Sequence, residues 1–350
     1  DDGRAESAAR RERAADRTGI YLSAKNAVPE KLPDYFAYLD RHGFDSVVVD
    51  FKDDDGHVTY DSEVATARAA GAVQPTIDPH FLVEEAAKHD IYVIARIVVF
   101  KDPKLWAYDD HRYALWDGRH DQPWGVFRSY ADQESGESRT VQVEHWVDPY
   151  SSDVWAYNVA IAQEAASLGV DEIQFDYIRF PSDGFTDDIR ARYAVDGADR
   201  TQALEGFLAS ARREIGIPVG IDVFGFNAWA QMSYLGQDIT RLARYVDVIS
   251  PMFYPSHFAR PFLSQFSYLD RAETIYDLGT RRTAELAARA GSPRGTLIRP
   301  YIQAFLIGDE LEFDTPTYRR YLDVQVEASN RAKSSGYTLW NASGRYYMLP

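Results

Sequence analysis

Residues 171–181 read Asp-Glu-Ile-Gln-Phe-Asp-Tyr-Ile-Arg-Phe-Pro, a mostly apolar and aromatic run that carries a few ionisable side chains. Such a run predicts a buried strand, because the strands of a helix-covered parallel sheet are nearly continuous in apolar residues. It lies between two stretches with helical spacing, 152–168 and 201–214. A strand with a helix on each side is the repeating unit of an α/β protein.

Seven further runs of the same kind extend this alternation along the chain. They are 19–24, 44–52, 91–100, 218–226, 246–254, 297–305 and 336–343. Further helices are expected near 33–41, 78–88, 272–290 and 317–333. Asp78 and Pro79 support one of these helices, as an N-cap and a first-turn proline.

Eight strand–helix repeats predict a single closed (β/α)₈ barrel, of the TIM-barrel kind. The alternative, a doubly wound open sheet, is disfavoured because no glycine-rich phosphate loop follows the first strand. Tyr21-Leu22-Ser23-Ala24-Lys25-Asn26 stands there instead. We therefore expect residues 19–350 to form one catalytic barrel domain, and residues 1–18, which are charged and alanine-rich, to be a flexible leader.

Residues 101–150 form a segment too long for an ordinary strand-to-helix loop. After the third strand, it should lie over the catalytic face of the barrel. It holds four of the seven tryptophans: Trp106, Trp116, Trp124 and Trp146. Two interpretations are equally supported, namely aromatic platforms that stack on sugar rings and a small core for the insertion itself.

Composition narrows the range of partners. The 350-residue chain has a formal net charge of −16, which opposes binding to nucleic acid and favours a neutral or cationic partner, although solubility alone would explain an acidic surface. It has no cysteine, so disulfides, thiolate metal sites and cysteine nucleophiles are excluded. No apolar run approaches the length of a membrane span. The leader resembles the start of a processed exported protein, so we expect an extracytoplasmic location.

Polar residues at the carboxyl ends of barrel strands converge on the active site. Asp176 and Asp222 are ionisable residues at matching heights in two otherwise apolar strands that should be neighbours. Cleavage of a glycosidic bond needs such a pair, one carboxylate at the anomeric centre and one acid for the leaving oxygen. The alternative is a structural aspartate, ion-paired to Arg96 or Arg179. Catalysis is the favoured interpretation.

Three segments carry a family resemblance: Phe175-Asp176-Tyr177-Ile178-Arg179-Phe180-Pro181, Gly19-Ile20-Tyr21-Leu22-Ser23 and Val49-Asp50-Phe51-Lys52-Asp53. With Asp222 and Met252-Phe253-Tyr254-Pro255, they make the chain from about residue 18 onward resemble a bacterial family of glycoside hydrolase domains, formerly uncharacterised. The resemblance implies a TIM barrel distantly similar to the α-amylase superfamily, with an aspartate nucleophile on strand four and the acid/base on strand five.

The chain departs from the amylase pattern in two places. Strand five offers Asp222 rather than a glutamate, and Gln174 stands two residues before Asp176, where that superfamily has an arginine. The identity of the sugar therefore does not carry over from the superfamily.

We accordingly expect a hydrolase of O-glycosidic bonds in a poly- or oligosaccharide, with Asp176 as nucleophile and Asp222 as general acid/base. Neighbouring strands lie ~4.7–4.9 Å apart, which favours the ~5–5.5 Å carboxyl separation of retaining enzymes. The expected substrate-binding residues are Asp50, Lys52, Arg96, Trp124, Tyr177, Arg179, Tyr254, Gln303 and Trp340. For Arg96 and Gln303, buried structural hydrogen bonding is equally supported. The alternative function is a carbohydrate-binding barrel without catalysis.

No cofactor or metal is expected. The histidines show no HxH or HExxH spacing, and no GxSxG nucleophile motif is present. Asp53-Asp54-Asp55-Gly56 superficially resembles a calcium loop, but Phe51 and Ser62 would then occupy its first and last ligand positions. A solvated turn is the favoured interpretation of that segment.

Overall fold

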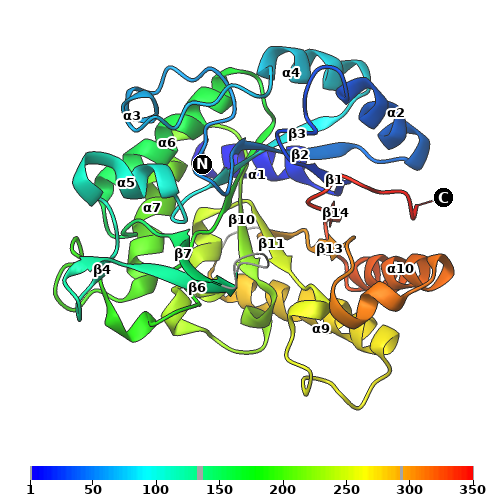
Figure 1. The fold of residues 1–350 in the computed structure, drawn as a ribbon. Helices are drawn as coiled ribbons and strands as arrows, with labels where there is room; N and C mark the ends of the chain where they lie inside the picture. Colours follow the sequence, from blue (N-terminus) through cyan, green and yellow to red (C-terminus); the bar gives the residue numbers. More distant parts are fainter. Residues whose placement is uncertain (1, 132–136, 292–294, 350) are drawn as a thin grey trace.

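The computed structural model describes residues 2–131, 137–291 and 295–349, and its centre is a closed parallel barrel (Figure 1). The barrel strands are β1 (Arg17–Leu22), β2 (Ser46–Lys52), β3 (Tyr92–Val98), β8 (Glu172–Asp176), β10 (Val219–Phe224), β11 (Val248–Met252), β12 and β13 (Leu297–Ile298 and Tyr301–Gln303), and β14 (Gly336–Trp340). Each pairs in parallel with its neighbours, and the pairings β1–β14 and β10–β11 close the ring. All eight expected runs supply a barrel strand, which confirms the predicted (β/α)₈ fold.

Helices surround the barrel. The main ones are α2 (Leu32–His42), α4 (Pro79–Lys88), α6 (Ser152–Ser167), α7 (Arg200–Glu214), α9 (Tyr268–Arg289) and α10 (Thr315–Arg331), with short α3 (Ala65–Ala69) and α8 (Ile239–Leu242). Asp78 caps α4 by accepting from the Phe81 amide, as expected. Asp199 and Gln202 form a capping box at the start of α7. In the described part of the chain, none of the helices combines the length and the apolar character needed to cross a bilayer.

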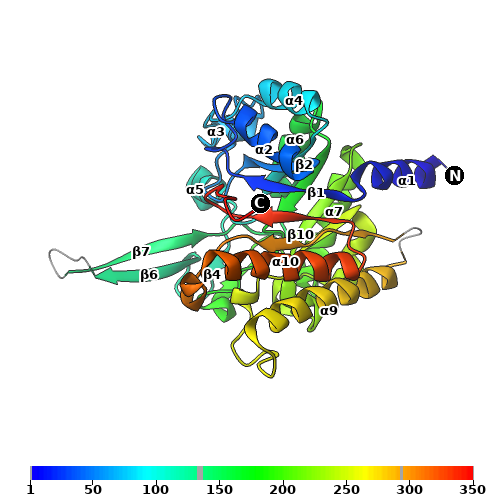
Figure 2. The ribbon, with the colours of Figure 1, turned by 90° about the vertical axis from the view of Figure 1, so that its right-hand side faces the viewer.

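The insertion after β3 contains α5 (Pro103–His111) and the strands β4 (Trp116–Asp117), β5 (Gln122–Pro123), β6 (Gly125–Ala131) and β7 (Ser138–His145). β6 and β7 form an antiparallel hairpin, and β4 pairs with β9 (Ile189–Arg190) from the loop after β8. Figure 2 shows the hairpin projecting away from the barrel on the side toward which β1 and β14 run. The insertion therefore lies at the carboxyl end of the strands, but its hairpin extends outward and does not lie flat across the mouth.

The N-terminal segment differs from our expectation of a flexible leader. Residues Asp2–Ala14 form helix α1, which lies at the end of the barrel opposite the hairpin (Figure 2). Arg10 forms an ion pair with Asp247, and the buried carbonyl of Ala14 accepts a hydrogen bond from Arg299. These contacts to residues at the amino ends of the strands hold the helix against the barrel.

The lower interior of the barrel contains a buried ion pair. Arg299 donates to both carboxylate oxygens of Glu172, at 2.9 and 3.1 Å, and both side chains are fully buried. The hydroxyl of Tyr92 donates to the same carboxylate. A buried charge pair with these additional hydrogen bonds compensates for the loss of hydration, whereas an isolated buried charge would not be tolerated.

Glu172→Gln should lower the free energy of unfolding by about 3–5 kcal/mol, because it leaves the Arg299 charge buried without its partner. Urea denaturation monitored by tryptophan fluorescence measures this loss. Arg320→Gln, which removes the exposed pair with Glu327, is the matched control and should change stability by less than about 1 kcal/mol. Equal effects of the two substitutions would contradict a structural role for the buried pair.

Candidate active site

The upper interior of the barrel is organised around the guanidinium of Arg96, which extends from β3 and is 1% exposed. It donates to Asp176 from Nε at 3.0 Å and from Nη2 at 2.6 Å, and to Asp50 from Nη1 at 2.7 Å. Both terminal nitrogens also donate to Asp54, at 3.2 Å. One cation thus faces three carboxylates, so this part of the interior is acidic.

Asp176 is held in a fixed orientation by these contacts. Arg96 binds its Oδ2, and its Oδ1 accepts a hydrogen bond from the backbone amide of Tyr177 at 2.6 Å. Tyr177 has a left-handed φ of 51°, an unusual conformation for a non-glycine residue directly after a strand. Hydrogen bonds from a cation are short and strong, so they fix the orientation of the Asp176 carboxylate.

Asp222 lies beside Asp176 but in a different electrostatic environment. Ile221 pairs with Phe175, so the next residues of β10 and β8 are Asp222 and Asp176. No described group hydrogen-bonds to either carboxylate oxygen of Asp222, and the residue is 1% exposed. Burial raises the pKa of Asp222 well above its usual range, and the negative charge of Asp176 raises it further. The two neighbouring carboxyl groups therefore lie in different environments, as groups with divided roles require: Asp176 is bound by Arg96, whereas Asp222 has no described hydrogen-bond partner.

Asp50 is the third acidic group of this interior. Its Oδ2 accepts a hydrogen bond from the Tyr21 hydroxyl at 2.5 Å, while Oδ1 is bound by Arg96. Burial raises the pKa of Asp50 to about 6, although the Arg96 charge opposes the shift. The Tyr21 ring in turn stacks on Trp340 at 3.7 Å.

A cavity of about 400 Å³ opens above this cluster. Its charged lining comprises Arg96 from β3, Asp176 at the end of β8 and Arg179 from the loop after β8. Asp54, Glu144 and Asp183 complete it. Its aromatic lining comprises Tyr177, Phe224, Phe226, Tyr254, Phe258, Tyr301 and Trp340, with His257 beside them. Concave sites with aromatic walls and a few convergent polar groups are typical of small-molecule binding.

Comparison with known proteins assigns the chain to a family. Residues 19–346 match the model of a family described as "Putative glycosyl hydrolase domain". The chain belongs to this family. The glycosyl hydrolase domain covers the whole barrel, and the match confirms the resemblance and the enzyme class expected from the sequence. No curated protein sequence matches the chain.

Solved structures resemble this glycosyl hydrolase domain in fold. The glycoside hydrolase domain of PgaB (BpsB) from Bordetella bronchiseptica is 13% identical, with a TM-score of 0.53 over 93% of this chain and 94% of that one. Trehalose-6-phosphate hydrolase (TreA) from Bacillus licheniformis is 12% identical, with a TM-score of 0.53 over 93% of this chain and 64% of that one. A hypothetical protein from Ruminiclostridium thermocellum ATCC 27405 is 31% identical, with a TM-score of 0.49 over 58% of this chain and 97% of that one.

The domain brings six of the eleven expected site residues to the cavity surface: Arg96, Asp176, Tyr177, Arg179, Tyr254 and Trp340. Asp50 and Asp222 lie within the polar interior beneath it, where both are almost fully buried. Arg96 also explains the missing arginine two residues before Asp176. The guanidinium that binds Asp176 comes from the adjacent strand β3, and Gln174 instead accepts from Tyr301 and donates to Ser250.

Lys52, Gln303 and Trp124 lie outside the cavity lining. This differs from the substrate-binding role expected for Lys52 and Trp124, whereas for Gln303 it agrees with the structural alternative. Lys52 is fully buried, with its Nζ 2.6 Å from Asp102 and hydrogen-bonded to the Val98 carbonyl. Gln303 is also fully buried and donates to Glu310 at 2.7 Å. Trp124 is 2% exposed and donates from Nε1 to the Phe185 carbonyl. Each of these side chains has its polar group bound by the protein itself.

The other insertion tryptophans pack against the barrel core and against the loop after β8. Trp146 is buried and Trp106 packs against the hydrophobic core, where its Nε1 donates to the Trp124 carbonyl. Trp116 packs beneath the Arg192 guanidinium. The lining of the cavity, as far as the structure describes it, includes none of the four tryptophans. Their placement does not support sugar platforms in this cavity, and Trp106, Trp124 and Trp146 pack with the core of the barrel rather than in a separate core of the insertion.

Asp54 and Glu144 are cavity residues that the sequence reasoning missed. Asp54 lies two residues beyond the end of β2, and a strand-end position of this kind predicts a site residue. The sequence reasoning instead assigned Asp54 to a solvated acidic turn. Glu144 comes from the end of β7, and its carboxylate accepts from Trp146 Nε1 at 2.8 Å. Nothing in its sequence context indicates that the insertion returns to the barrel at this point.

Among the residues that the structure describes, one group could hold a metal ion: Asp53, Asp55 and His57. Asp53 Oδ1 already accepts from the backbone amides of Asp55 and His57, which close the turn. This arrangement agrees with the turn interpretation of the segment, and the three residues do not line the cavity.

The raised pKa values of Asp50 and Asp222 make the free energy of unfolding depend on pH. A carboxyl whose pKa is higher in the folded state contributes stability that is present below its unfolded pKa of ~3.9 and is lost as pH rises through the folded value. Asp50 loses its contribution between about pH 4 and about pH 6, and Asp222 loses its contribution over a range that begins at the same pH.

Asp222→Asn should therefore become more stable relative to wild type as pH rises above about 4, by up to ~1.4 kcal/mol per pH unit. The measurement is the free energy of unfolding in urea across a pH series, taken as the difference between the two proteins. This difference cancels the contributions of the carboxyl groups that do not interact with Asp222. A difference that is constant with pH would show that Asp222 has an ordinary pKa in the folded state.

Proposed function

We propose that this glycosyl hydrolase domain is a retaining hydrolase of O-glycosidic bonds in poly- or oligosaccharides, with Asp176 as nucleophile and Asp222 as general acid/base. One observation carries the proposal: adjacent carboxyl groups on β8 and β10 have opposite environments, Asp176 bound by Arg96 and Asp222 buried without a described partner. Retaining glycosidases need this division between an ionised nucleophile and a protonated acid. Asp176 lines a cavity with aromatic walls and Asp222 lies beneath it, which supports a sugar as the ligand.

In the first step, a carboxylate oxygen of Asp176 attacks the anomeric carbon as the bond to the leaving oxygen breaks, and Asp222 gives its proton to that oxygen. The product is a covalent glycosyl ester on Asp176. In the second step, Asp222 takes a proton from water, whose oxygen attacks the same carbon and releases Asp176. Arg96 holds Asp176 in a fixed orientation, so little reorganisation is needed during attack.

The carbohydrate-binding alternative is favoured by a separate observation. Asp222 is 1% exposed and does not line the cavity. Tyr254 and Tyr301 do line it, and both interact electrostatically with Asp222. Proton transfer requires contact with the glycosidic oxygen, so catalysis requires a movement that opens a path from the cavity to Asp222. A barrel that only binds sugars would need no such movement.

Asp176→Asn and Asp222→Asn should each lower kcat by about a thousandfold or more, because each removes a group that acts in the transition state. Purified protein is first screened against bacterial, fungal and plant polysaccharides, with reducing ends as the readout. Asp61→Asn, an exposed aspartate outside the cavity, is the matched control and should retain full activity. Full activity in either site variant would remove that residue from the mechanism.

The stereochemistry of the first-formed product tests the nucleophile separately. Proton NMR during early hydrolysis should show the anomeric configuration of the substrate, because two successive displacements at one carbon restore it. An inverted product would overturn the role of Asp176. A protein that binds a polysaccharide of the panel but hydrolyses none would favour the carbohydrate-binding alternative.

We also propose action outside the cytoplasm, which fits polymeric substrates.

A further inference from the structure

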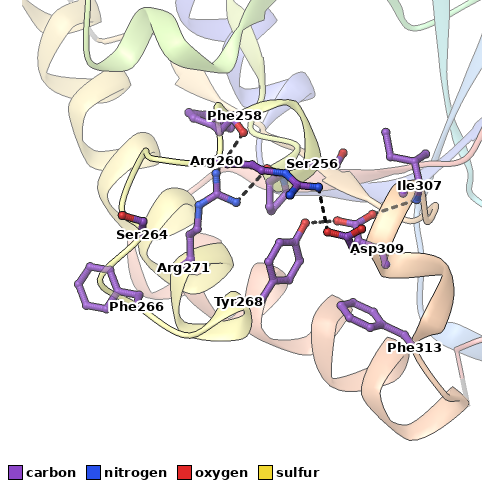
Figure 3. Close-up of a pocket in the computed structure, with 13 residues that line it drawn as sticks. Ser256, Phe258, Arg260, Ser264, Phe266, Tyr268, Arg271, Ile307, Asp309 and Phe313 are labelled. Atoms are coloured by element: carbon purple, nitrogen blue, oxygen red, sulfur yellow. Dashed lines mark hydrogen bonds and ion pairs between the residues drawn. The ribbon is translucent and has the colours of Figure 1, made fainter.

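A second cavity, of about 600 Å³, lies beside the catalytic cavity and shares Phe258 with it. Figure 3 shows the residues that line this second cavity. Its walls come from the loop between β11 and α9 and from the loop between β13 and α10. Both loops follow the carboxyl ends of strands, where substrate sites of such barrels are built. The two cavities share Phe258, and the neighbours Pro255 and Ser256 line one while Tyr254 and His257 line the other.

The second cavity combines aromatic surfaces with exposed polar groups. Figure 3 shows Tyr268 between Phe266 and Phe313, and the rings of Tyr268 and Phe313 lie 5.9 Å apart. Phe266 is 42% exposed, which is unusual for a phenylalanine in a well-packed loop. Arg260 and Asp309 form an exposed ion pair at 3.1 Å between the two loops. Aromatic faces beside hydrogen-bonding groups of zero net charge suit a neutral, hydroxylated ligand.

The cavity is shaped by buried polar residues. Arg271 is 6% exposed and donates to four backbone carbonyls of the β11–α9 loop, those of Pro255, Phe258, Ala259 and Phe262. On the opposite wall, the Glu310 carboxylate accepts hydrogen bonds from Gln303 and Tyr321 at 2.7 and 2.8 Å, and also from Tyr268. A loop fixed in this way presents a preformed surface, which lowers the entropic cost of binding.

Because the two cavities share Phe258, we infer that the substrate is an extended glycan chain. This chain runs from the catalytic cavity across Phe258 into the second cavity, where Phe266 and Tyr268 stack on a distant sugar unit. The inference rests on the proposed function for the catalytic cavity. It adds that the enzyme selects long chains over disaccharides, because only a long chain fills both cavities. Binding energy from distant units of a substrate can also be used at the reacting centre.

The test measures binding rather than turnover, in the full chain carrying Asp176→Asn. The probes are disaccharides and long soluble oligomers of starch, cellulose, xylan, chitin and laminarin, with dissociation constants measured by calorimetry. At least one oligomer series should bind more tightly as its length increases. Adding Phe266→Ala should weaken binding of the long oligomer by about tenfold and leave disaccharide binding unchanged.

Leu311→Ala is the matched control, since Leu311 is 69% exposed beside the second cavity but does not line it. Arg260→Ala is a second variant with a fully solvated side chain, and it should also weaken only the long oligomer. Equal losses for long and short ligands, no effect of Phe266→Ala, or no glycan binding in any series would overturn the inference. If length-dependent binding is lost in Phe266→Ala while wild type hydrolyses no glycan, the second cavity stands and the hydrolytic proposal fails.

Discussion

The guanidinium of Arg96 is the interaction on which the candidate active site depends. It is buried inside the barrel and donates to Asp176, Asp50 and Asp54, which come from two strands and the loop after one of them. Without this cation, three carboxylates would face one another with no positive charge between them, and Asp50 and Asp176 would do so almost fully buried, which is costly. Because arginine keeps its charge and has five fixed donors, it can orient several carboxylates at once, which a lysine could not do.

The same cation explains why Asp222 differs from Asp176. Arg96 bonds directly to Asp176 but contributes only a weaker, more distant attraction to Asp222, whose pKa is governed by burial and by the charge of Asp176. A charge arrangement of this kind makes folding less favourable at neutral pH, and nothing in the packing of the barrel requires it. Such unfavourable interactions are commonly retained where a site needs them for chemistry.

The sequence predicted the barrel well because its strands are buried on both faces. Parallel strands under helices must be almost wholly apolar, so all eight appear as distinct runs, and the ionisable residues within them mark the interior. Asp176, Arg96 and Tyr254 were found for this reason. Asp54 and Glu144 were missed because they lie on a turn and on an insertion, where the course of the chain is set by tertiary contacts rather than by a local repeat.

Lys52 shows why a strand-end position alone does not identify a site residue. Lys52 pairs with Ile97 at a register irregularity between β2 and β3, and its side chain meets Asp102 and Asn158 of α6 rather than the cavity. Asp102 also caps α5 by accepting from the Leu105 amide, and its own amide donates to the carbonyl of His145. Lys52 thus fixes both ends of the insertion to the barrel, and the residue adjacent to His145 is Glu144, which lines the cavity. Lys52, which its place in the sequence suggested as a substrate-binding residue, instead anchors the backbone that leads to a residue of the cavity.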